Sequence, residues 1–270
     1  MLKKIAFIYA ALVLCACSSS DSAVKSTESN SSSSENVSAY LHYWLTPPQP
    51  SNLVVIGVSG KQIDHETEIA VAREDAARKV AMYHGVQVAS ETVQAIGSGF
   101  LDHYIKSQIN IEYDQQLEKY TDKLVFDPER DVTNGEIDGR NILFIRFTYP
   151  AVFPGGMIYS SGKKPNGSPE WISRPPVSSG NFFLGVGHSG KQFRLSDTIL
   201  KSYESAAAAI AAQISTTIET AEQIDTGAYQ NTSAIVRKSA GNLRHFAVIE
   251  TWIDPDNLNV WTLAVAENAH

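Results

Sequence analysis

Two segments of this 270-residue chain are similar to each other, and this internal similarity constrains the fold more than any other feature. Strand-like apolar runs at 53–58 and 182–187 each lead to the same tetrapeptide, Ser-Gly-Lys-Gln, at 59–62 and 189–192. A constant offset of 130 residues then holds through an alanine-rich stretch that follows each tetrapeptide. The matching positions are Ile69, Ala76, Ala77, Val80 and Ala81 in the first stretch and Ile199, Ala206, Ala207, Ile210 and Ala211 in the second.

The apolar spacing after each tetrapeptide predicts an amphipathic helix. Spacings of four and seven residues put Ile69, Ala76 and Val80 on one face, where small alanines suit close packing against a sheet. The second helix carries four consecutive alanines at 206–209, so we expect its outer face to be covered as well. In the first helix we expect four charged side chains to face water: Arg73, Glu74, Arg78 and Lys79.

The rest of each segment predicts further strands, a second and polar helix, and a closing β-hairpin. Turn residues separate the β-rich stretches, with Asn134-Gly135 as an additional turn signal in the first segment. Strands are expected at 86–95 and 216–222, polar helices at 100–119 and about 229–239, and hairpin turns at 138–141 and 254–257.

These elements predict an α+β fold of two tandem repeats. Each repeat is expected to be a mostly antiparallel sheet packed on its alanine-rich helix, with the polar helix as an extra element. We expect repeat 1 at 40–150 and repeat 2 at 170–270, joined by a linker at 151–169 that is rich in Gly, Pro and Ser.

The N-terminus has the pattern of a secretory leader. After a basic start, an apolar run covers 5–16, which at 12 residues is too short to span a bilayer of about 30 Å as a helix. The run ends at Cys17 and turns to serine, a pattern similar to the bacterial lipobox, whose last cysteine is lipidated and becomes the N-terminus. Cys17 fits this motif because small Ala16 precedes it, whereas bulky Leu14 precedes Cys15.

We therefore predict a signal peptide at 1–16, and lipidated Cys17 with a serine-rich tether at 17–39. An ordinary secretory signal that contains cysteine is the alternative. Ser18 favours the outer membrane, in its periplasmic or surface-exposed leaflet. Because Cys15 and Cys17 are the only cysteines, the mature protein has no thiol for a disulfide, a nucleophile or zinc. The net charge of −7, about −9 without the two leader lysines, disfavours nucleic acid.

Four short motifs mark the second repeat. They are Pro-Glu-Trp-Ile-Ser-Arg-Pro at 169–175, Leu-Gly-Val-Gly at 184–187, the alanine-rich helix at 206–212 and Asn-Val-Trp-Thr-Leu-Ala at 259–264. Together with the lipobox and the tether they resemble the LPP20 family of bacterial lipoproteins. The first repeat departs from the pattern at Ser59, where the family has the second Gly of Gly-x-Gly.

This resemblance implies an outer-membrane or surface lipoprotein built of small α+β domains with dodecin-like β-α-β-β topology. Some relatives are cell-surface antigens and others are structural parts around the flagellar motor, so a motility- or surface-associated role is implied. The resemblance supplies no catalytic residue.

The motifs of common enzyme and cofactor sites are incomplete. The segment 185–192 nearly matches the phosphate loop, but Gln192 stands where magnesium binding needs Ser or Thr, which disfavours nucleotide binding. The turn at 254–257 lacks the glycine and glutamate of an EF-hand calcium loop. We therefore assign no catalytic, cofactor-binding or metal-binding residue and predict a protein that is not an enzyme. The seven histidines form no ligand motif: His42, His65, His84, His103, His188, His245 and His270.

The expected function is therefore a structural, assembly or partner-binding role in the cell envelope. The partners would be membrane lipid, reached through the lipidated terminus, and envelope proteins or further copies of the chain. The alternative is a carrier or sensor that binds a small apolar or aromatic ligand between the repeats, near the tryptophans. For the tryptophans themselves we expect core packing. A third hypothesis, an envelope hydrolase, predicts a deep pocket that holds a strained carboxylate or histidine with a partner. The tryptophans are Trp44, Trp171, Trp252 and Trp261.

Overall fold

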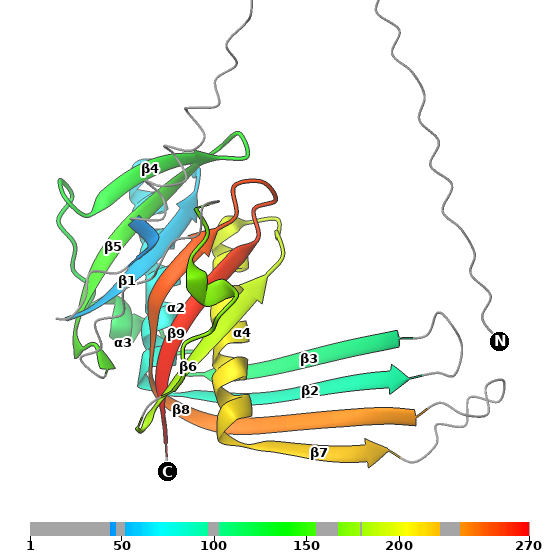
Figure 1. Ribbon diagram of the computed structural model, residues 1–270. Coiled ribbons are helices and arrows are strands. Elements are labelled where there is room, and N and C mark those ends of the chain that lie inside the picture. The colour runs from blue at the N-terminus through cyan, green and yellow to red at the C-terminus, as the bar shows by residue number, and fades with distance from the viewer. Residues whose placement is uncertain are drawn as a thin grey trace, which may run out of the picture. The chain divides into compact units, whose positions relative to one another are not determined.

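The computed structural model describes residues 44–46, 52–96, 103–154, 167–178, 180–221 and 233–269. They form an α+β fold in which two antiparallel sheets pack against three helices (Figure 1). The α+β fold and the antiparallel pairing expected from the sequence are confirmed.

The smaller sheet has the strand order β1-β5-β4, with bounds Asn52–Gly60, Arg140–Val152 and Val132–Ile137. Asp138 and Gly139 join β4 to β5 with φ of 56° and 68°. Two successive positive φ angles define a tight hairpin turn that favours Asp-Gly. The turn expected at 138–141 is therefore confirmed at Asp138-Gly139, and β5 already begins at Arg140. The expected turn at Asn134-Gly135 is wrong, because β4 runs through it and Gly135 pairs with Ile142. The later turn keeps Ile137 and Ile142 in the core.

The larger sheet has the order β3-β2-β8-β9-β6, and β7 also pairs with β8. Strand β8 is 21 residues long: its first half pairs with β2 on one edge and β7 on the other, and its second half pairs with β9. We call β3, β2, β7 and the first half of β8 the arm; Figure 1 shows these four strands side by side. The bounds are β2 Val86–Ile96, β3 His103–Tyr113, β6 Phe182–Ser189, β7 Thr216–Ala221, β8 Ser233–Ile253 and β9 Val260–Asn268.

The two long helices are α2, His65–His84, and α4, Leu195–Ile214, with 20 residues each. Asp64 caps α2 by accepting a hydrogen bond from the Thr67 backbone N–H at 2.8 Å. The alanine stripes of both helices are fully buried, as their spacing predicts. In α4, residues 206–208 are buried and Ala209 is half-buried, so the expected cover over the outer face is confirmed for most of the run. The short elements are α3, Glu118–Thr121, and the 3-10 turn η2, Glu170–Ile172.

Three glycines allow the helices to lie close to their strands. A Cβ on Gly187 of β6 would lie 2.0 Å from the Ser202 carbonyl oxygen of α4, and one on Gly57 of β1 would lie 2.1 Å from the Ala72 carbonyl oxygen of α2. Gly185 has a similar contact with α4. No side chain fits at these positions, so the glycines of Leu-Gly-Val-Gly serve helix packing.

The expected polar helices at 100–119 and 229–239 are wrong. Strand β3 covers 103–113 and β8 begins at Ser233. Of the described residues within 100–119, only Glu118 and Lys119, the start of α3, are helical; residues 100–102 and 229–232 lie outside the described residues. The sequence carries the reason: Ile105, Ile109 and Ile111 alternate with polar residues, a period of two that is typical of strands. Pairing with β2 over eleven residues then satisfies the backbone of β3.

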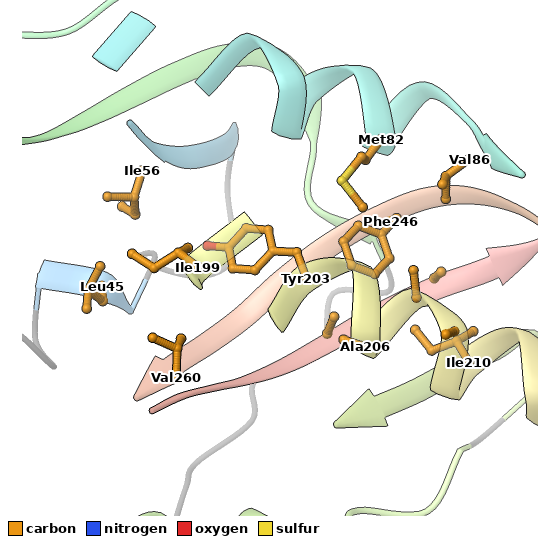
Figure 2. Close-up of a cluster of buried hydrophobic side chains, with 14 of the residues drawn as sticks. Leu45, Ile56, Met82, Val86, Ile199, Tyr203, Ala206, Ile210, Phe246 and Val260 are labelled. Atoms are coloured by element: carbon orange, nitrogen blue, oxygen red, sulfur yellow. The ribbon is translucent and has the colours of Figure 1, made fainter. Parts of the chain in front are cut away.

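The hydrophobic core consists of two clusters, and each joins residues before 151 to residues after 169. In the first, Ile56 of β1 and Met82 of α2 lie around Tyr203 of α4, with Phe246 of β8 beside them (Figure 2). In the second, alanines of α2 pack with Trp171 and with alternate residues of β8 and β9. The first half of the chain therefore shares its core with the second.

Candidate functional site

The predicted lipidation site, Cys17, lies outside the described residues, as do the predicted leader and the whole of the predicted tether. Lipidation and anchoring therefore stay predictions. Among the described residues, none of the helices is both long and apolar enough to cross a membrane.

The two Ser-Gly-Lys-Gln loops make the same hydrogen bonds. The Val58 backbone N–H donates to Asp75 Oδ2 at 2.9 Å, and the His188 N–H, 130 residues later, donates to Ser205 Oγ at 3.2 Å. The backbone N–H of each loop glutamine donates to a side chain six residues further on. Each loop serine donates to the carbonyl of the glycine after it. The loops therefore share one conformation, which folds back on the start of α2 or α4.

A groove of 620 Å³ lies between these loops; we call it the loop groove. Residues 60–62 line it on one side and residues 191–196 on the other, and the β4–β5 turn and Leu258 complete it. Its charged side chains are Lys61, Arg140, Lys191, Arg194 and Asp138. Four cations and one carboxylate give this surface the opposite sign to the whole chain, whose net charge is −7.

Two of the four cations already have acidic partners. Lys61 Nζ lies 3.1 Å from Glu68 Oε1, and Lys191 Nζ lies 2.6 Å from Asp138 Oδ2. The hydrogen bond from Lys191 lowers the pKa of Asp138, so this carboxylate is charged at neutral pH. Arg140 instead donates to the Phe193 carbonyl at 2.8 Å, with its guanidinium 5.1 Å from the Phe193 ring centroid.

A buried ion pair lies between α2 and β1, and it corrects the expectation that Lys79 faces water. Asp75 and Lys79 are 2% and 4% exposed, and Lys79 Nζ lies 2.7 Å from Asp75 Oδ2. Lys79 also donates to the Ile56 carbonyl, and Nζ lies 5.3 Å from the Tyr203 ring centroid. The second half of the chain accounts for the burial: Tyr203 of α4 and residues 246–248 of β8 lie around Lys79, which gives α2 a second inner face.

Arg73, also expected to face water, is half-buried, because it donates to the carbonyls of Thr121 and Leu124 beside α3. Glu74 and Arg78 form an ion pair on the outer side of α2, where side-chain exposures of 54% and 35% fit the expectation.

Two histidines gather with tyrosines where the arm meets the remaining strands. His84 Nε2 lies 2.8 Å from Tyr149 Oη, and its ring stacks on Tyr120. Burial lowers the pKa of His84, and nearby lysines lower it further. His245 has a strained φ of 52° at an irregularity of β8, and its Nδ1 lies 3.1 Å from Glu267 Oε2.

This arrangement includes the strained histidine with a carboxylate partner that the hydrolase hypothesis requires. The partners are half-exposed, with side-chain exposures of 44% for His245 and 32% for Glu267, so the pair is not at the base of a deep pocket. Within the part of the chain that the structure describes, there is no group of three His, Cys, Asp or Glu side chains placed to hold a metal ion.

The tryptophans are packing residues to different degrees. Trp171 is fully buried and donates from Nε1 to Glu250 Oε2 at 2.8 Å, whereas Trp44 is 8% exposed, with the Arg146 guanidinium 4.4 Å from its ring. Trp252 and Trp261 face each other across β8 and β9 and are half-buried. Core packing, as expected, is confirmed for Trp171 and Trp44.

Sequence reasoning identified both loops but not the groove between them. The repeated Lys-Gln was the available signal, yet its meaning depends on how the two halves pack. Comparisons of the chain with known protein families, curated proteins and solved structures find no match.

Proposed function

We propose that this chain is a lipid-anchored envelope lipoprotein whose folded part has a structural, assembly or partner-binding role and is not an enzyme. The support for the anchor is Cys17 at the end of the leader-like segment, followed by serine-rich sequence. Placement in the outer membrane and membership of the LPP20 family belong to the same proposal, and both depend on sequence resemblance.

The proposal includes two copies of one structural unit. In support, α2 and α4 have equal lengths and begin 130 residues apart, at His65 and Leu195. Each follows a strand and precedes another, and the orders β1-β5-β4 and β6-β9-β8 correspond. The repeated hydrogen bonds of the two loops are further support, since Asp75 and Ser205 accept from equivalent backbone groups.

The observation that carries the assembly role is the arm. Within the described residues β3 pairs with β2 alone and β7 with β8 alone, so both outer edges of the arm have no strand partner. All neighbours in the arm are antiparallel, so β3 and β7 run in opposite directions. A second copy placed beside the first would therefore pair its β7 with β3 in the same antiparallel pattern. Self-assembly through these edges is the mode of contact that we propose.

Anchoring is tested by labelling cells with an alkyne-bearing fatty acid and comparing Cys17→Ala with Cys15→Ala. We expect Cys17→Ala to lose the label and to accumulate with its leader, whereas Cys15→Ala keeps both labelling and processing. Label retained by Cys17→Ala would reject the anchor.

Assembly is tested by sedimentation velocity of the full chain in nonionic detergent over a range of concentrations. Ile109 of β3 is 43% exposed, and lysine on an edge strand opposes pairing, so Ile109→Lys should shift assemblies towards the monomer. The matched control is Val177→Lys, at a loop position that is 88% exposed and outside the arm. Wild-type protein that stays monomeric, or equal effects of the two variants, would reject self-assembly through this edge.

A further inference from the structure

The positively charged side chains of the loop groove lie around one cavity. Four cationic side chains from three separate segments converge on a cavity of 620 Å³, and Asp138 is the one carboxylate among its lining residues. The surrounding chain is acidic, with a net charge of −7. A local field of opposite sign in a concave surface attracts anions and raises their local concentration.

The two arginines are the cations free to contact a ligand. Arg140 donates one N–H to the Phe193 carbonyl at 2.8 Å, which ties its guanidinium to the peptide group immediately before Arg194. The Arg194 side chain makes no hydrogen bond or ion pair with the described residues, and neither arginine has an acidic partner among them. Guanidinium groups present several N–H donors in a planar fork that matches phosphate and carboxylate oxygens.

The lysines contribute mainly to the field. Lys61 is paired with Glu68, and Lys191 with Asp138. Asp138 lines the same groove as the arginines and adds repulsion for an incoming anion. A change that removes this carboxylate should therefore strengthen anion binding, in the direction opposite to the loss of an arginine.

Apolar groups complete the lining. Val71, Ile137 and Leu258 border the groove, and the Phe193 ring beside Arg140 is 79% exposed. A cavity of this volume is within the range that holds small organic molecules. The groove thus suits an organic anion better than a bare ion.

From these observations we infer that the loop groove binds an organic oxyanion through Arg140 and Arg194, with phosphate or carboxylate as the recognised group. The same chemistry occurs in a free metabolite and in the headgroup of an anionic lipid. The inference is independent of the proposed self-assembly, because the groove lies outside the arm.

The experiment is calorimetric titration of the full chain in nonionic detergent with three probes: glycerol 3-phosphate, citrate and short-chain phosphatidylglycerol. We expect saturable binding that weakens with added salt. Arg140→Gln and Arg194→Gln should each weaken it about tenfold, the loss expected for one charge-assisted hydrogen-bonding group. Binding of the soluble anions points to a free ligand, and binding of the lipid alone points to a headgroup; both outcomes support the site.

Two further variants make the test specific. Arg174→Gln removes an exposed arginine outside the groove and should leave binding unchanged. Asp138→Asn should tighten binding, and asparagine tolerates the φ of 56° at this position. Absence of saturable binding for all three probes, or equal weakening by Arg174→Gln, would overturn the inference.

Discussion

Breaking the buried Asp75–Lys79 pair on one side should destabilise the protein far more than replacing both partners. In Lys79→Ala, the Asp75 carboxylate stays 2% exposed and keeps only its hydrogen bond from the Val58 N–H. In Asp75→Ser, the Lys79 ammonium stays buried against the Ile56 carbonyl and the Tyr203 ring. An uncompensated buried charge costs about 3–5 kcal/mol. At this chain length, such a loss lowers Tm by roughly 6–20 °C.

The second half of the chain suggests the compensating double variant. Ser205 and Ala209 stand 130 residues after Asp75 and Lys79, and Ser205 Oγ accepts from the His188 N–H as Asp75 does from the Val58 N–H. Asp75→Ser with Lys79→Ala removes both charges and keeps an acceptor. Its remaining cost is the packing of the lysine stem, about 2 kcal/mol.

The assay is urea unfolding of the wild type, both single variants and the double variant, followed by circular dichroism. We expect the double variant to be more stable than either single variant, with a coupling of more than about 2 kcal/mol. Glu74→Ser and Arg78→Ala form the matched control cycle, because this pair has the same spacing on the exposed side of α2 and should couple by less than about 1 kcal/mol. Single costs that simply add up in the Asp75–Lys79 cycle would refute the reasoning.

Two further predictions concern packing and protonation. Gly187→Ala should lower the free energy of unfolding by about 3 kcal/mol, because its Cβ would lie 2.0 Å from the Ser202 carbonyl oxygen. In the control Gly190→Ala the nearest atom is 3.8 Å from the new Cβ, so this free energy should change by less than about 1 kcal/mol. Equal urea midpoints for the two variants would contradict this prediction. Burial, aided by nearby lysines, lowers the pKa of His84 below 6.5 in the folded state, so the unfolded chain takes up its proton first as the pH falls. Stability should therefore decrease as the pH falls below 6.5 and level off below the folded-state pKa of His84. In His84→Gln, urea midpoints measured between about pH 5 and 8 should depend less on pH. An unchanged pH dependence in the variant would assign the effect to other groups.

Most of the local structure can be predicted from the sequence. Apolar spacing located α2 and α4, and Asp138-Gly139 located the tight hairpin turn. These features depend on neighbours in the chain, so periodicity and turn chemistry are enough to predict them. The helix expected at 100–119 is wrong at 103–113, because the alternation of Ile105, Ile109 and Ile111, and not the polarity of the stretch, specifies a strand.

Non-local packing accounts for what could not be predicted. Burial of Lys79 requires Tyr203 of α4 and strand β8 to cover α2, and the loop groove requires residues 61 and 191 to approach each other. The pairing of β2 with β8 joins residues about 150 positions apart, such as Val93 and Val236, and no local pattern specifies it. Charged residues on a helix are predicted to face solvent unless the element that covers them is known.

The length of β8 has a mechanical consequence. Its one continuous backbone is hydrogen-bonded to β2 and β7 near its start and to β9 near its end. Tension applied at the tip of the arm would therefore travel along a single strand, past the irregularity at His245, to the sheet that supports α4. A second copy paired with the arm, as we propose, would therefore transmit force to a strand that contributes to both core clusters.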